Sequence, residues 1–172
     1  PRLATLPKDY VNALLESFRL SVSSMNTYLR CPLSFFYEYV LQAPTLMSEA
    51  ATYGEAMHRA WQRFFEHMLS RKNKAFPSEK RLIDYFEEEL KNLRHQLSDG
   101  EFRRRLEMGR KSLSHYFRNE LSNWKKEVRL EFNIKNCEIE GVPVTGTIDK
   151  LVFLSNIEAK IVDNKTGKAD PK

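Results

Sequence analysis

The spacing of hydrophobic residues changes partway along the chain. From residue 49 to about 125, large apolar side chains recur every three or four positions, which is typical of amphipathic helices. From residue 128 onward, apolar and polar side chains alternate, which is typical of strands with one buried face. The pattern predicts an α/β fold in which a helical N-terminal half packs on a small mixed or antiparallel sheet.

Capping residues and breakers divide the helical half into segments. We expect a short helix or ordered arm near 10–18, a helix from Ser21 or Ser23 to about Arg30, one from Pro32 to about 41, one over 49–71, one from Ser78 to about Leu97, and one over 101–125. Asp99 and Gly100 are expected to separate the last two helices. The stretch 1–20 is expected to be an arm that precedes the main domain, 21–172.

The alternating half reads as an antiparallel meander. Strands are expected over 128–135, 142–154 and 158–163, with turns at Glu140–Gly141 and Ser155–Asn156. In the middle strand, Ile148 and Lys150 share one face and Asp149 lies on the other. Asp149 can therefore point towards a site on one face of the strand while Ile148 and Lys150 lie on the other face.

Candidate chemistry gathers at the ends of the last two strands. Asp149 lies in an alternating apolar run, Asp163 follows another, and Lys165 lies two residues beyond Asp163 on the same face of an extended chain. Two carboxylates beside an ammonium group suit a hard divalent cation with a positioned lysine, and such a site can hydrolyse a phosphodiester. Taken singly, Asp149 could be a solvent-facing acid, and residues 163–167 a simple turn.

Composition narrows the class of protein. The formal net charge of +5 and the pI near 9.2 suit a polyanionic partner, although each basic cluster can also be a solvated surface. Two distant cysteines do not suggest a disulfide framework. No apolar run approaches the ~20 residues that span a bilayer, and the first ten residues show no signal-peptide core, so we expect no membrane partner and a cytoplasmic, nucleoid-associated location in a prokaryotic-type cell.

The acid motifs are similar to those of the PD-(D/E)XK nuclease superfamily, and more closely to its RecB-type branch. The resemblance rests on Gly146–Asp149 followed by Val162–Gly167, on the stretch SSMNTYLRCPLSFFY at 23–37, and on Gly54–His58, which resembles a Gly-x-x-x-His motif. The motifs occur in the family's order across most of the chain. They imply a restriction-endonuclease-like core.

The resemblance also implies roles for single residues. It implies catalytic roles for Asp149, Asp163 and Lys165, and a Mg²⁺ or Mn²⁺ site formed by His58, Asp149, Asp163 and the Asn164 backbone carbonyl. Without it, His58 would be read as a structural histidine on an apolar helix face. Lys165 is expected to orient or deprotonate the attacking water and to balance developing charge.

Four further residues have expected accessory roles. Glu131 resembles an acid often present on the first strand of this branch, where a salt bridge is an equal alternative to an accessory site role. Arg30 and Lys168 are candidates for DNA contact. In some relatives a cysteine at the position of Cys31 ligates a [4Fe–4S] cluster, which needs four thiolates, so here the cluster is expected only in a longer parent chain.

The expected function is that of a metal-dependent DNA nuclease, acting as an exonuclease or end-processing domain in repair or recombination beside a helicase. The chain begins without methionine and lacks the family's C-terminal Gln-x-x-x-Tyr motif, so we expect a fragment of a larger helicase–nuclease, which can be inactive alone. Two alternatives are a catalytically inactive DNA-binding or scaffold module of the same fold and a metal-dependent hydrolase of another substrate.

Overall fold

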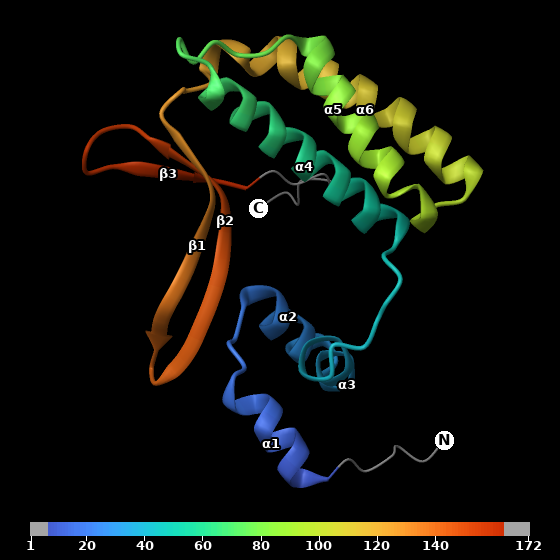
Figure 1. Cartoon of the computed structure of the whole chain (residues 1–172), viewed down its shortest axis with the longest axis vertical. Helices are drawn as coiled ribbons and strands as arrows, with labels where there is room; N and C mark the ends of the chain where they lie inside the picture. Colours follow the sequence, from blue (N-terminus) through green and yellow to red (C-terminus); the bar gives the residue numbers. More distant parts are fainter. Residues whose placement is uncertain (1–6, 164–172) are drawn as a thin grey trace. The chain divides into compact units, whose positions relative to one another are not determined.

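The computed structural model describes residues 7–163, which fall into two compact units (Figure 1). The first unit contains the chain up to residue 45 together with 133–147. The second contains 46–132 together with the chain from 148 onward. The long strands β1 (Val128–Ile139) and β2 (Val142–Phe153) therefore contribute to both units. The predicted boundary between an arm and a core at residue 20 stays a prediction.

Short helices make up most of the first unit. They are α1 (Lys8–Glu16), α2 (Val22–Arg30), α3 (Pro32–Phe35) and the π-helical turn η1 (Phe36–Val40). The predicted cap at Ser21 is confirmed, because the Ser24 N–H donates to Ser21 Oγ at 3.1 Å and the Ser21 N–H donates to Ser24 Oγ at 2.8 Å. The helix predicted over 32–41 widens into the π turn, where the Leu41 N–H donates to the carbonyl of Phe36.

Three helices dominate the second unit and lie side by side (Figure 1): α4 (Glu49–Ser70), α5 (Glu79–Asn92) and α6 (Asp99–Glu120). The prediction that Asp99 and Gly100 separate the last two helices is wrong, because both belong to α6. Ser98 caps this helix, and its N–H and hydroxyl both donate to Glu101. Both predicted C-termini were also too late, since short 3₁₀ turns at Arg94–Gln96 and Leu121–Asn123 follow α5 and α6.

The core of the second unit lies among these helices and the base of the sheet. Aromatic side chains of α4, including Trp61, Phe64 and Phe65, are buried against α5 and α6. Val128 and Leu130 at the start of β1 pack against the same cluster. The helices therefore hold the start of β1 through apolar burial, which is the largest favourable term in folding. None of the helices within residues 7–163 is long and apolar enough to cross a membrane.

The sheet has the order β1-β2-β3, with β3 spanning Ala159–Val162. A two-residue turn at Glu140 and Gly141 joins β1 to β2, and both residues have the positive φ that this hairpin turn requires. β2 and β3 are antiparallel, with Lys150 opposite Val162 and Phe153 opposite Ala159. The predicted helical half and antiparallel meander are confirmed. In the first unit, Leu20 also forms a parallel bridge to Val144.

The contact between α5 and α6 depends on a glycine. A Cβ atom at Gly109 would overlap the ring of Phe86, which is fully buried and has no room to move. We expect Gly109→Ala to lower the free energy of unfolding by about 2–3 kcal/mol through overpacking. Gly100→Ala is the matched control, because its Cβ would meet nothing within 4 Å, and it should be neutral or slightly stabilising. Urea denaturation of both variants measures the difference, and equal effects would contradict the close approach.

Candidate metal centre

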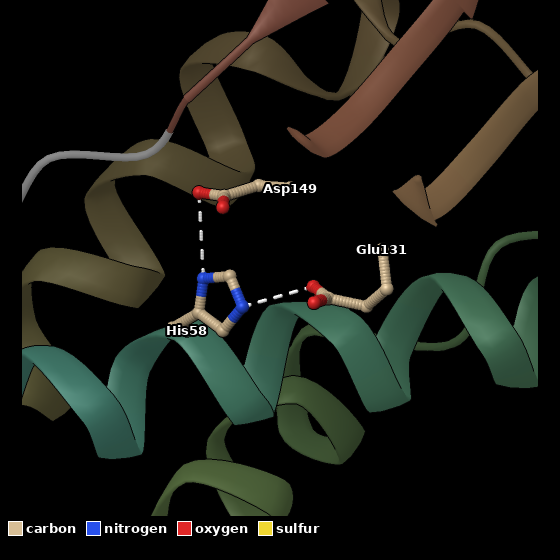
Figure 2. Close-up of side chains that lie close together, drawn as sticks. All are labelled: His58, Glu131 and Asp149. Atoms are coloured by element: carbon tan, nitrogen blue, oxygen red, sulfur yellow. Dashed lines mark hydrogen bonds and ion pairs between the residues drawn. The ribbon is translucent and has the colours of Figure 1, made fainter. Parts of the chain in front are cut away.

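His58 lies on α4 with its imidazole between two carboxylates that come from different strands (Figure 2). His58 Nε2 is 2.9 Å from Glu131 Oε1, and His58 Nδ1 is 3.4 Å from Asp149 Oδ2. The three side chains are between 25% and 33% exposed, so they are shielded but open to a ligand. The helix thus presents a ring whose orientation is fixed from both sides.

Glu131 reaches this centre through an unusual backbone conformation. Its φ is +47°, in the left-handed region that residues other than glycine rarely adopt. The strict alternation along β1 fails at this point, since Leu130, Glu131 and Phe132 are all partly buried. The conformation turns the carboxylate towards His58, which lies 73 positions earlier in the chain. Backbone conformations of this kind cost free energy and are concentrated at functional sites.

Asp149 is supplied by the middle of β2, in the half of the strand that belongs to the second unit. Its carboxylate meets the ring nitrogen of His58 that Glu131 does not contact (Figure 2). The adjacent residues Ile148 and Lys150 face inward, which fixes the strand against the helical core. The candidate acid named from the sequence therefore lies beside the candidate histidine.

These three residues form a donor set that fits a divalent metal. Among the described residues 7–163, three or more potential ligands with donor atoms within 4.8 Å of one another occur in this group. Carboxylate oxygens suit Mg²⁺ and Mn²⁺, and an imidazole nitrogen adds affinity for the softer of the two. One ring nitrogen can bind a metal while a carboxylate holds the other, which is a common arrangement around metal-bound histidines.

Asp163 lies near this centre but outside that donor group. It directly follows β3 and lines the same groove as His58. The volume of this groove is about 480 Å³. The clustered donors include Glu131, which the sequence suggested as an accessory acid, and the assignment of Asp163 as a metal ligand stays a prediction. The remaining predicted site residues, Asn164, Lys165 and Lys168, lie outside the described residues.

Arg30 and Cys31 belong to the first unit. Arg30 is the exposed last residue of α2, and Cys31 lies between α2 and α3. Hydrogen bonds from Ser34 hold the pKa of the Cys31 thiol below its ordinary value. Cys31 and Cys137 are both free thiols, and two cysteines cannot supply the four thiolates of a [4Fe–4S] cluster.

Sequence reasoning assigned no role to Lys150, yet it is a buried charged residue next to the centre. It is 9% exposed, and its Nζ lies 4.1 Å from the centroid of the Phe65 ring. Burial lowers the pKa of this ammonium group from 10.5 to about 8. The alternation along β2 places Lys150 on the same strand face as the apolar Ile148, and this pattern in the sequence could have indicated that Lys150 is buried.

The lowered pKa predicts how Lys150 affects stability. Below pH 8 the group is charged in both the folded and the unfolded chain, so the folded chain bears the full cost of burying it. From pH 8 to 10.5 the unfolded chain binds more protons, so this cost disappears as the pH rises. After allowance for the lost ring contact, Lys150→Met should stabilise the metal-free protein by about 1–2 kcal/mol at pH 7.

Denaturation in EDTA at pH 7 and pH 10.5 measures this effect. The advantage of Lys150→Met over wild type should shrink at the higher pH, whereas Lys160→Met, at an exposed position of β3, should show no advantage at either pH. A stabilisation by Lys150→Met that is independent of pH would contradict the assignment of a buried charge.

Comparison with known proteins identifies a family for this chain. The sequence matches the family model described as the PD-(D/E)XK nuclease superfamily over residues 19–172. The match covers every element that contributes to the centre and begins just before Leu20. Neither the curated proteins nor the solved structures contain a match to this chain.

Proposed function

Because the chain belongs to the PD-(D/E)XK nuclease superfamily, and its fold is the α/β, restriction-endonuclease-like fold expected from the sequence, we propose that His58, Glu131 and Asp149 hold Mg²⁺ or Mn²⁺ in a deoxyribonuclease site. The family implies a nuclease that uses a divalent metal to act on nucleic acid. The observation that carries the more specific proposal is the imidazole held between two carboxylates at 2.9 and 3.4 Å.

The side chains of the centre divide the work. Glu131 and Asp149 each contact one ring nitrogen of His58, and the three residues offer donor atoms that lie within 4.8 Å of one another. One ring nitrogen would bind the metal, while a carboxylate holds the other. When bound there, a divalent metal supplies Lewis-acid stabilisation of the phosphate charge. Asp163 lines the same groove as His58 and adds a carboxylate to the wall of the proposed substrate-binding region.

Lys165 completes the proposed chemistry. We propose that its amine orients the attacking water and accepts a proton from it, while the Asn164 carbonyl adds a further oxygen donor. The oxygen of water then forms a bond to phosphorus in line with the P–O bond that breaks, and the leaving oxygen takes up a proton. The position of Lys165 two residues after Asp163 supports this assignment.

We further propose that the substrate is DNA and that the site processes strand ends beside a helicase. The RecB-type motif set at 23–37, Gly54–His58, Gly146–Asp149 and Val162–Gly167 supports this role. The net charge of +5 supports a polyanionic substrate held largely through salt-sensitive phosphate contacts, with Arg30 and Lys168 among the proposed contacts. A cytoplasmic, nucleoid-associated location follows from the same role and is part of the proposal.

Cleavage assays with a labelled single strand, a blunt duplex and an RNA of the same sequence test this function. We expect turnover with Mn²⁺ or Mg²⁺, none in EDTA, and a loss of activity in His58→Gln. His95→Gln is the matched control, because His95 lies in a 3₁₀ turn outside the centre, and it should retain activity. Salt-sensitive DNA binding without turnover in any metal would instead support an inactive scaffold, and turnover of RNA alone would overturn the assignment of DNA.

A further inference from the structure

A groove opens beside the metal centre between α4 and α6. Its volume is about 480 Å³, within the range of about 300–1,000 Å³ that is common for small-ligand sites. His58 and Asp163 lie on its wall, so the groove is continuous with the proposed reaction site. Its other lining residues are mostly aromatic or apolar: Tyr53, Met57, Trp61, Met108, Leu113 and Tyr116.

Tyr53 and Trp61 in this groove are almost fully buried and belong to the core, whereas Tyr116 on α6 is accessible from the groove. Tyr116 remains 42% exposed and Met108 39% exposed, although both belong to the helix that closes the groove. The ring of Tyr116 packs edge-on against Trp61, with centroids 5.4 Å apart, which holds the tyrosine in place. The groove therefore presents one supported aromatic ring, that of Tyr116, with the exposed Met108 beside it, next to a centre that binds phosphate in the proposed function.

We propose that this groove is a subsite for one unpaired nucleobase of the strand whose phosphate lies at the metal centre. The inference rests on the proposed nuclease function and specifies the form of its substrate. A base is flat and apolar on its faces, and aromatic side chains stack on it with little dependence on its identity. Ser112 and His115 in the wall offer hydrogen-bonding groups to its edge.

The chemistry of the groove selects an unpaired base. In a duplex, both faces of each base are covered by its neighbours and its edge is covered by its partner. Entry into a groove of this kind therefore requires the base to leave the stack, which costs least when the strand is already single. Strand ends and single strands are the forms of DNA that satisfy this requirement.

The surface beyond the groove is suited to the adjoining backbone. Met108 and Ser112 also line a shallow neighbouring depression that is bordered by Arg104 and Lys111. Both basic side chains are well exposed. Lys111 forms an exposed ion pair with Glu107, which contributes little to stability, and Arg104 pairs with the partly buried Glu49, which Arg105 also contacts and would still neutralise. Either cation can therefore exchange its partner for a phosphate at low cost.

Filling the groove tests this inference without removing a core contact. Met108→Trp places a large ring in the groove, and Leu69→Trp is the matched control at another exposed apolar position, near the end of α4. Binding of a single strand that carries 2-aminopurine is followed by fluorescence in Ca²⁺. We expect Met108→Trp to weaken this binding about tenfold and Leu69→Trp to leave it unchanged.

A strand in which an abasic site is moved one nucleotide at a time provides the second arm. In the wild type, an abasic site at one position of the strand should lower affinity about tenfold, as Met108→Trp does with the intact strand. With the abasic site at that position, Met108→Trp should cause no further loss of affinity. The base subsite would be overturned if Met108→Trp bound the intact strand as tightly as wild type does. It would also be overturned if Met108→Trp weakened binding of a blunt duplex as much as binding of the single strand. Failure of the nuclease proposal would appear separately, as an absence of Mn²⁺ binding and of cleavage in the wild-type chain.

Discussion

Asp149→Asn is expected to abolish metal-dependent cleavage while the protein remains folded. The substitution keeps the size of the side chain but removes the charge that faces His58 Nδ1 at 3.4 Å. A neutral amide is a weaker ligand for a divalent cation and a weaker partner for the ring. Because Lewis-acid stabilisation is worth several kcal/mol, we expect turnover to fall by about 10³-fold or more.

The same variant should lose metal affinity, which separates a ligand from a residue that acts only in the chemical step. Calorimetric titration with Mn²⁺ should show binding to wild type and a loss of at least about tenfold in Asp149→Asn. Asp9→Asn, at an exposed position of α1, is the control and should match wild type in both assays. Unchanged Mn²⁺ affinity in Asp149→Asn would remove Asp149 from the metal centre.

Lys165→Met is expected to produce the other large loss, with a different signature. The proposed amine acts on the attacking water, so its removal should lower turnover by about 10²–10⁴-fold, as is typical for loss of a general base. It is not proposed as a ligand, so Mn²⁺ affinity should stay within about twofold of wild type. Single-turnover cleavage, measured beside calorimetry, separates the two effects.

Lys160→Met is the matched control for this prediction, because it removes an exposed lysine from β3 five positions earlier. It should retain both turnover and metal affinity. If Lys165→Met cleaves as fast as the control, the catalytic assignment of Lys165 fails, although the metal centre itself would stand. Loss of metal binding in Lys165→Met would contradict a role that is confined to the attacking water.

The sequence predicted the architecture where local signals act alone. Serine caps at Ser21 and Ser78 and the turn at Glu140–Gly141 are local, and all three are present in the structure. The change from helical to alternating periodicity correctly located the start of β1 at Val128. The start of α6 was missed because Gly100 was read as a breaker, although the pairing of Ser98 with Glu101 stabilises the helix end around it.

The candidate site was predictable only in part. His58 and Asp149 were named from the motif set, and the structure brings their side chains, from α4 and β2, within 3.4 Å of each other. The contact of Glu131 with His58 depends on one residue with positive φ, and no local pattern at this position signals such a conformation. The groove between α4 and α6 depends on side chains from distant segments, so the spacing of any single segment does not reveal it.

Pulsed electron paramagnetic resonance of Mn²⁺ bound to the full chain tests the central claim most directly. A manganese ion held by His58 and the two carboxylates should show the ¹⁴N coupling of a directly bound imidazole. The account predicts this coupling in the wild-type chain and its loss in His58→Gln, with the coupling retained in His95→Gln. Bound Mn²⁺ without nitrogen coupling in the wild type, or coupling that survives in His58→Gln, would contradict a metal centre at His58, Glu131 and Asp149.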